Sequence, residues 1–245
     1  MERRLKICVA GAAGTVGREV VRAVAASDDL ALTGAVSRRE AGRRVGEVVE
    51  GAASDLTFRA TLAEALETPA DVLIDYTEPA AAEAHASLAA GRGAHVVIGA
   101  TGFDEAAFER LGELAGRHSV GIVVGHNFAI TTALLEKCAA MIASYLPAYA
   151  VTDYASPHVR APLGTSVGIR RSFAGGRAGE IPIHSIRAPG YTSAVEVVFG
   201  DGDEQLTLRH SNNSVAAYVR GTLMAARAVP SVRGLRRGIA WMFEG

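Results

Sequence analysis

Residues 6–17 read KICVAGAAGTVG and decide the fold of the N-terminal half. Residues 6–10 form a short apolar run typical of a buried strand, and an apolar-periodic segment follows over residues 16–26. The glycines at positions 11, 14 and 17 therefore lie in a turn between a strand and a helix. Glycines in such a turn let backbone amides and the positive end of a helix approach a pyrophosphate. The segment predicts a dinucleotide-binding turn.

This turn departs from the commonest dinucleotide fingerprint at one position, where Ala13 replaces a glycine. Its context, a strand before and a helix after, is the one that the motif requires. We therefore expect the pyrophosphate to lie on the turn and on the first residues of the helix. The expected contacts come from Gly11, Ala13, Gly14, Thr15 and Val16.

The second apolar strand, residues 30–36, ends at Ser37-Arg38-Arg39. Proteins that prefer NAD usually carry an acidic residue near this point, which binds the 2′-hydroxyl of the ribose. Arginine guanidinium groups instead suit a 2′-phosphate, so the sequence predicts that NADPH is preferred and that NADH is possible. The alternative is that Arg38 and Arg39 form a solvated loop together with Arg43 and Arg44.

Strands and helices alternate along the rest of the first half. Strands are expected over residues 72–74, 94–98 and 120–124, and helices over 62–66, 80–91, 104–116 and 130–144. After Pro147, strands are expected over 150–154, 181–188, 193–199 and 205–210, with one good helix over 214–229. The first pattern indicates a doubly wound parallel sheet and the second a mixed or antiparallel sheet with a covering helix.

The predicted fold is therefore α/β, with an N-terminal Rossmann-type domain and a C-terminal α+β domain. We expect residues 1–128 to bind the dinucleotide and to be joined by the C-terminal helix region, about residues 211–245. Residues 129–210 are expected to bind substrate.

Composition excludes several classes of protein. Lys and Arg total 25 against 26 Asp and Glu, which leaves no global electrostatic reason to bind nucleic acid or an anionic membrane. Glu136 and Lys137 interrupt the otherwise apolar stretch 128–146, so no transmembrane span is predicted. The chain starts without a secretory signal pattern, and a cytoplasmic location is expected. Cys8 and Cys138 are expected to be buried, and the seven histidines do not fall at metal-ligand spacing.

Several ordered segments make the chain resemble the dihydrodipicolinate reductase family, whose members reduce a cyclic unsaturated imino diacid with a nicotinamide cofactor. In the first half these segments are the turn 11–17, DYTEP at 75–79, GATGF at 99–103 and NFA at 127–129. In the second half they are IPIHSIR at 181–187, EVVFG at 196–200 and LTLRH at 206–210. The resemblance implies a homotetramer built through the sheets of the second domain.

The resemblance also implies where the nicotinamide lies. In the family, the segments that match 99–101 and 125–128 run along the cofactor, where backbone amides and short polar side chains can hold a carboxamide. The cofactor residues expected on this basis are Tyr76, Thr77, Gly99, Ala100, Thr101, His126, Asn127 and Phe128.

The segment that matches the active site departs from the family. Ala155 and Ser156 fall where the family has two adjacent histidines, no lysine remains, and one residue is missing between His158 and Ala161. The usual proton donor and its lysine partner are therefore absent. Only residues 166–179 separate this segment from the next strand, where the family has a longer helical stretch, so a differently shaped pocket is expected.

Part of the substrate site is kept, because Gly164 and Thr165 match the pair that donates hydrogen bonds to a substrate carboxylate in the family. We take His158 as a candidate proton donor near neutral pH and Arg160 as a candidate carboxylate ligand. Asp153 and Tyr154 are further possible donors.

Three hypotheses stay open at this point. The first is a diverged reductase that acts on a carboxylated cyclic imine or on its conjugated alkene. The second is an authentic dihydrodipicolinate reductase that tolerates the altered motif. The third is a protein that binds NADP(H) without catalysis.

Overall fold

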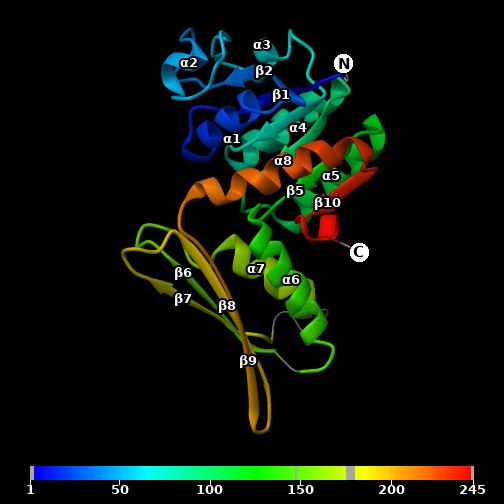
Figure 1. Ribbon diagram of the computed structural model, residues 1–245. Helices are drawn as coiled ribbons and strands as arrows, with labels where there is room; N and C mark the ends of the chain where they lie inside the picture. Colours follow the sequence, from blue (N-terminus) through cyan, green and yellow to red (C-terminus); the bar gives the residue numbers. More distant parts are fainter. Residues whose placement is uncertain (1–2, 147, 175–179, 244–245) are drawn as a thin grey trace.

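The computed structural model describes residues 3–146, 148–174 and 180–243, which form a six-stranded and a four-stranded sheet (Figure 1). The six-stranded sheet contains β1 (Leu5–Ala10), β2 (Leu30–Val36), β3 (Val72–Asp75), β4 (His95–Ile98), β5 (Gly121–Val124) and β10 (Gly234–Arg237). Its strands lie in the order β10-β5-β4-β3-β1-β2, and every neighbouring pair is parallel. The chain leaves β1 to one side for β2 and returns to the other side for β3, which places a ligand crevice at the carboxyl end of β1.

Helices cover both faces of this parallel sheet (Figure 1). The main ones are α1 (Thr15–Ala25), α4 (Pro79–Gly91), α5 (Glu105–His118) and α8 (Val219–Ala228), with short helices α2 (Val45–Val48) and α3 (Leu62–Ala65). One core cluster joins α1 and α8 to the sheet through residues such as Val20 and Leu223, and the other joins α4 and α5 through Ala86 and Leu111. Pro79 occupies the first turn of α4, where its missing N–H costs no hydrogen bond.

The four-stranded sheet is mixed. It contains β6 (Ala148–Ala155), β7 (Ile183–Arg187), β8 (Ser193–Asp201) and β9 (Glu204–Asn212) in the order β7-β6-β8-β9, with β6 and β7 parallel and the other pairs antiparallel. Helices α6 (Ile130–Ile142) and α7 (Gly164–Ala174) pack on one face, where Leu135, Ile169 and Phe199 are buried together. Within the described residues, no helix covers the opposite face (Figure 1).

The predicted fold class is confirmed, but two elements were not predicted and the expected burial of Cys138 is wrong. Helix α7 was not expected, because its two glycines and short polar residues have low helix propensity; burial of Ile169 against the sheet stabilises it. Strand β10, with sequence GLRR, lacks an apolar pattern but pairs with β5 at the edge of the sheet. Cys138 is exposed, on a side of α6 that also leaves Leu134 and Met141 exposed, whereas Cys8 is buried as expected.

The C-terminal region is more broken than the single helix expected over 214–229. A 3₁₀ turn at Val215–Tyr218 precedes α8, and further 3₁₀ turns follow at Val229–Ser231 and Ala240–Phe243. Between the last two, β10 returns the chain to the parallel sheet.

Candidate active site

The turn after β1 has the geometry of an anion-binding loop. Gly11 has a φ of +73°, and a side chain there would meet the carbonyl oxygen of Tyr76 at 2.7 Å. The amide of Gly14 donates to the carbonyl of Gly11 at 2.9 Å, and α1 begins at Thr15 with no acidic residue in its first turn. Gly14 and Thr15 are exposed, so the first amides of α1 are accessible to a phosphate group.

Other predicted cofactor residues lie at the carboxyl ends of neighbouring strands. Arg38 and Arg39 are exposed in the turn after β2. After β3, the hydroxyl of Tyr76 forms a 2.6 Å hydrogen bond with Thr222, and the hydroxyl of Thr77 donates to the buried carboxylate of Asp75 at 2.5 Å. These bonds hold the side chains of Tyr76 and Thr77 in place. The backbone of the two residues is then the part that can contact a ligand.

A cavity of about 770 Å³ lies between the carboxyl edge of the parallel sheet and helix α7. It brings together the predicted residues Ala100, Thr101, His126, Arg160 and Gly164. One face of α7 lines it from end to end: Gly164, Val167, Gly168, Arg171 and Ser172. Volumes of this size are typical of small-molecule sites.

Hydrogen bonds fasten the start of α7 to the segment after β5. Asn127 Nδ2 donates to Thr165 Oγ1 at 3.3 Å, and Thr165 Oγ1 donates to the carbonyl of His126 at 3.3 Å. Asn127 and Thr165 are nearly buried, and Phe128 is fully buried in the core. The side chains of Asn127 and Phe128 therefore position the segment after β5, while Gly164 and His126 line the cavity.

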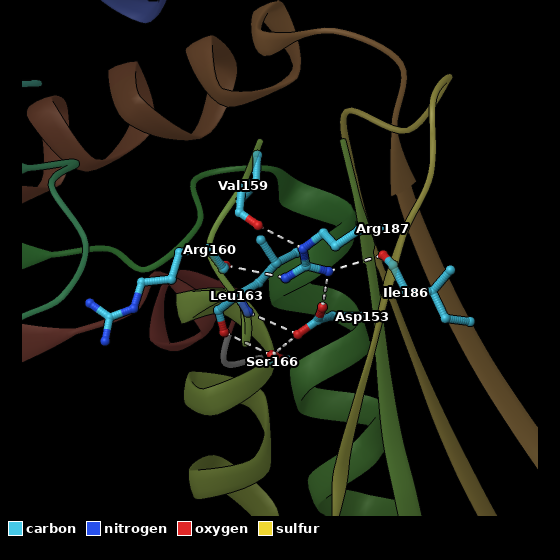
Figure 2. A network of polar contacts seen from close by, with 7 residues as sticks. All are labelled: Asp153, Val159, Arg160, Leu163, Ser166, Ile186 and Arg187. Carbon is cyan, nitrogen blue, oxygen red and sulfur yellow. Dashed lines mark hydrogen bonds and ion pairs between the residues drawn. The ribbon is translucent and has the colours of Figure 1, made fainter. Parts of the chain in front are cut away.

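A buried ion pair holds the divergent segment between β6 and α7 (Figure 2). Arg187 Nη1 lies 2.6 Å from Asp153 Oδ1, and Asp153 is fully buried. Asp153 Oδ2 also accepts hydrogen bonds from the Leu163 amide and the Ser166 hydroxyl, both at 2.8 Å. The remaining nitrogens of Arg187 reach the carbonyls of Val159 and Arg160. Both carboxylate oxygens of Asp153 are therefore occupied by structural contacts, which argues against a role as proton donor.

The two candidates from the divergent segment face different surroundings. The backbone of Arg160 is held by Arg187, while its side chain extends away from the network (Figure 2) and lines the cavity. His158 is exposed on a turn and does not line the cavity. Tyr154 stacks on Tyr191 with ring centroids 5.2 Å apart and lies under Arg209, also outside the cavity lining.

The inner part of the cavity holds an acid and a base that the sequence prediction did not pair. His126 Nε2 lies 3.7 Å from Glu136 Oε2, too far for a hydrogen bond, and Nε2 is buried without a partner among the described residues. Burial lowers the pKa of His126 to about 4. Burial also raises the pKa of Glu136 to about 7, and the neighbouring hydroxyl of Ser172 opposes this.

Only a weak signal could have found Glu136. A carboxylate that interrupts an apolar helix indicates either an exposed position or a buried functional one, and the sequence does not distinguish these. His126 was expected to touch the cofactor, and its contact with α6 was not foreseen.

The outer part of the cavity is bordered by an exposed charge network. Glu105 accepts from Arg171 at 3.0 Å and from Arg237 at 2.8 Å, and the guanidinium of Arg237 lies 3.8 Å from the centre of the Phe108 ring. These contacts connect α7, β10 and α5.

Two other kinds of chemistry find no support in the described residues. Residues 164–168 spell Gly-x-Ser-x-Gly, but Ser166 is buried inside a helix and bonded to Asp153, whereas a nucleophile elbow exposes its serine at a strand-to-helix turn. No group of three or more His, Cys, Asp or Glu side chains in the described part of the chain could hold a metal ion.

None of the described helices is both long and apolar enough to cross a membrane.

A parallel sheet with a glycine turn at its switch point, and a cavity between the ends of β4 and β5 and helix α7, is the arrangement of a nicotinamide-dependent oxidoreductase of the Rossmann type. The family models described as dihydrodipicolinate reductase, N-terminus and C-terminus, match residues 5–128 and 128–242. The chain belongs to the dihydrodipicolinate reductase family and is an NAD(P)H-dependent reductase.

Individual relatives cover the whole chain. The 4-hydroxy-tetrahydrodipicolinate reductase of Desulfitobacterium hafniense (strain DSM 10664 / DCB-2) is 31% identical over 266 residues, covering 99% of this chain and 100% of the relative. The enzyme of the same name from Synechocystis sp. is 31% identical over 265 residues, covering 96% of each. A dipicolinate-bound dihydrodipicolinate reductase from Paenisporosarcina sp. TG-14 has a TM-score of 0.81 at 24% identity, covering 98% of this chain and 100% of that one.

Proposed function

We propose that this chain transfers hydride from NADPH to a small carboxylated cyclic imine, and that it differs from its named relatives in substrate or in proton donor. The observation that supports this most is the cavity. It combines Thr101 from the predicted nicotinamide edge with Gly164 and Arg160 from the predicted substrate side. The substrate would lie between these two sides.

The substrate side suits a carboxylate. Gly164 and Thr165 begin α7, and amides in the first turn of a helix have no acceptor within the helix. The Arg160 guanidinium lines the same cavity and makes no ion pair with the described residues, so its donors are available for a carboxylate. When bound, the dihydronicotinamide would supply the hydride, and these residues would hold the imine against it.

The preference for NADPH is part of the same proposal. Arg38 and Arg39 are exposed after β2 and form no ion pair with another described residue. Both guanidinium groups are therefore available to bind a 2′-phosphate. Their neighbours Arg43 and Arg44 instead pair with Glu40 and Asp55.

We further propose that residues 1–128 with 211–245 bind the cofactor, and that residues 129–210 bind substrate and form a homotetramer. The uncovered face of the second sheet supports self-association, because Ile186 is 44% exposed there. Light scattering after size exclusion would measure the mass; a monomer would contradict this part. A cytoplasmic location stays a prediction from the sequence.

The test follows NADPH oxidation by absorbance with freshly generated dihydrodipicolinate and then with a panel of other cyclic imino acids. Arg160→Ala should raise KM for a carboxylated substrate about 10- to 100-fold, since hydrogen bonds to charged groups contribute about 1.5–3 kcal/mol. Arg117→Ala, which removes an exposed arginine at the end of α5, is the matched control.

The outcomes separate the three hypotheses. Turnover of other imines but not of dihydrodipicolinate supports a diverged reductase. Robust turnover of dihydrodipicolinate assigns the activity of the named relatives. Tight NADPH binding with no oxidation by any imine contradicts a catalytic function and leaves a cofactor-binding protein. Dipicolinate, the ligand of the Paenisporosarcina structure, serves as a non-reacting probe of the cavity.

A further inference from the structure

We propose that His126 and Glu136 form the proton donor of this reductase: His126 hands a proton to the substrate, and Glu136 replaces it. This inference rests on the proposed function, because it concerns the proton that must accompany the hydride. The proton donor is thus assigned to residues outside the divergent β6–α7 segment, in which His158 is exposed and does not line the cavity.

The position of His126 and Glu136 in the cavity supports this role. Both residues line the cavity that contains Thr101, Arg160 and Gly164, and they reach it from different elements. His126 follows β5 at the carboxyl edge of the parallel sheet, and Glu136 comes from the middle of α6. A substrate carboxylate at the start of α7 would therefore place its ring beside His126, because the backbone of His126 is bonded to Thr165.

The two nitrogens of His126 face different surroundings. Nε2 is buried and looks toward Glu136 Oε2 at 3.7 Å. Gly168 of α7 packs against the ring: a Cβ there would lie 2.7 Å from both Cγ and Nδ1. The imidazole therefore fits against α7 only because residue 168 is glycine, with Nε2 toward the acid and the residue in the cavity lining.

The protonation states explain why the two residues act together. Burial keeps the imidazole neutral at pH 7, and a neutral imidazole is a weak acid unless a second proton enters at its other nitrogen. Burial raises the pKa of Glu136 to about 7, which lets its carboxyl group hold such a proton near neutral pH. The 3.7 Å contact is therefore not a fixed ion pair.

The charged groups around the pair do not commit Glu136 to another role. On α6, the ammonium of Lys137 donates to the carbonyl of Phe243 at 2.6 Å. Arg171 on α7 and Arg237 at the end of β10 both pair with Glu105, and Arg160 extends from the β6–α7 segment. Ser172 on α7 is a neighbouring polar group, and its hydroxyl donates to the carbonyl of Ile169 at 2.7 Å.

For a C=N bond, the bound dihydronicotinamide would supply a hydride, with its electron pair, to the imine carbon, and the π electrons of that bond would move to nitrogen. That nitrogen takes the proton from His126 Nδ1, while Nε2 takes the proton of Glu136. The products are NADP⁺, an amine and a Glu136 carboxylate. Solvent then protonates Nδ1, and Nε2 returns its proton to Glu136.

The experiment measures kcat and KM against pH for Glu136→Gln, His126→Asn and His158→Ala, with the cyclic imino acid that the wild-type protein reduces fastest. In the wild type, kcat should fall as pH rises through about 7, where Glu136 loses its proton. Both cavity variants should lose about 10²–10⁴-fold in kcat with little change in KM, and Glu136→Gln should lose the pH-dependent fall. His158→Ala should keep both.

Controls separate a chemical role from a structural one. Glu83→Gln removes a carboxylate that pairs with Arg110 on the surface, and it should leave kcat unchanged. The Kd for NADPH, measured by fluorescence, should be the same in all variants that fold. In Glu136→Ala, added formate should restore part of kcat, which would not happen if the side chain served only to pack.

The outcomes of these measurements distinguish failure of the donor pair from failure of the reductase proposal. Wild-type turnover with an unchanged pH profile in Glu136→Gln, or a full loss in His158→Ala, overturns the donor pair and leaves the reductase proposal standing. Failure of the wild type to oxidise NADPH with any imine overturns both, because no reaction then needs a proton donor. Loss of NADPH binding in both cavity variants assigns them to structure and also overturns the pair.

Discussion

The turn after β1 and the segment between β6 and α7 are both loops that lead into a helix, but they are built in different ways. The first is shaped by backbone: Gly11 at positive φ, a Gly14-to-Gly11 hydrogen bond and the open amides of α1. The second is held by side chains, with Asp153 and Arg187 at the centre. A loop made from backbone keeps its function as long as its glycines remain, whereas a loop held by side chains can change its chemistry and keep its shape.

The largest expected effect comes from breaking the second loop at its centre. Asp153→Ala leaves the Arg187 guanidinium, 16% exposed, without its carboxylate and removes the acceptor of two loop hydrogen bonds. Loss of one partner of a buried pair costs about 3–5 kcal/mol in the free energy of unfolding. Urea unfolding measures it.

The matched control is Asp29→Ala, which removes an exposed aspartate that pairs with Arg227 in a similar way. That change should cost no more than about 1 kcal/mol. Equal losses in the two variants would contradict the central role of Asp153.

A second prediction concerns the pH dependence of stability and uses the inner part of the cavity. The pKa of His126 falls from 6.5 to about 4 on folding, so in that range the unfolded chain binds a proton that the folded protein does not, and stability rises with pH. The pKa of Glu136 rises from 4.5 to about 7, so stability falls with pH over that range.

The two contributions oppose each other, and single substitutions should uncover each slope. Relative to the wild type, Glu136→Gln should make the free energy of unfolding rise more steeply from about pH 4.5 to 6.5, and His126→Asn should make it fall. Each contribution reaches about 3 kcal/mol at most. Parallel curves for the two variants, measured by urea unfolding at a series of pH values, would be incompatible with these buried groups.

The third prediction sharpens the comparison on the side of the backbone-built turn. The double substitution Arg38→Ala/Arg39→Ala should weaken NADPH binding about 10- to 100-fold and leave NADH binding unchanged, because only NADPH has a 2′-phosphate. Isothermal titration with both cofactors measures this. An equal loss of affinity for the two cofactors, or no loss for either, would support the alternative that the arginines only form a solvated loop.

The smallest expected effect lies in the exposed charges that border the cavity. Glu105→Ala removes the contacts to Arg171 and Arg237, which are about half exposed. Its effect on the free energy of unfolding should stay below about 1 kcal/mol. A larger loss in thermal or urea unfolding would show that this network holds the two sheets together.

The same contrast explains what the sequence could predict. The fold class follows from glycines and apolar periodicity, which are local signals. Helix α7 has weak propensity and depends on packing of Ile169 against the second sheet, and β10 depends on pairing with β5. Neither is visible in a window of sequence.

The candidate site was predictable only in part. Ala100, Thr101, His126, Arg160 and Gly164 were predicted and do meet at one cavity. Glu136 was not, because its contact with His126 depends on how α6 packs beside the segment after β5, which the residue pattern of α6 does not indicate. The same limit applies to Cys138, whose apolar helix pattern indicated burial although its side of α6 is exposed.

The most direct test of the account is a crystal structure of the protein with NADP⁺ and dipicolinate. We expect the nicotinamide to lie beside Thr101 and a dipicolinate carboxylate to meet Arg160 and the amides at the start of α7. We also expect His126 to be the titratable side chain nearest the nicotinamide C4. A complex in which dipicolinate lies outside this cavity, or in which His158 is nearest to C4, would contradict it.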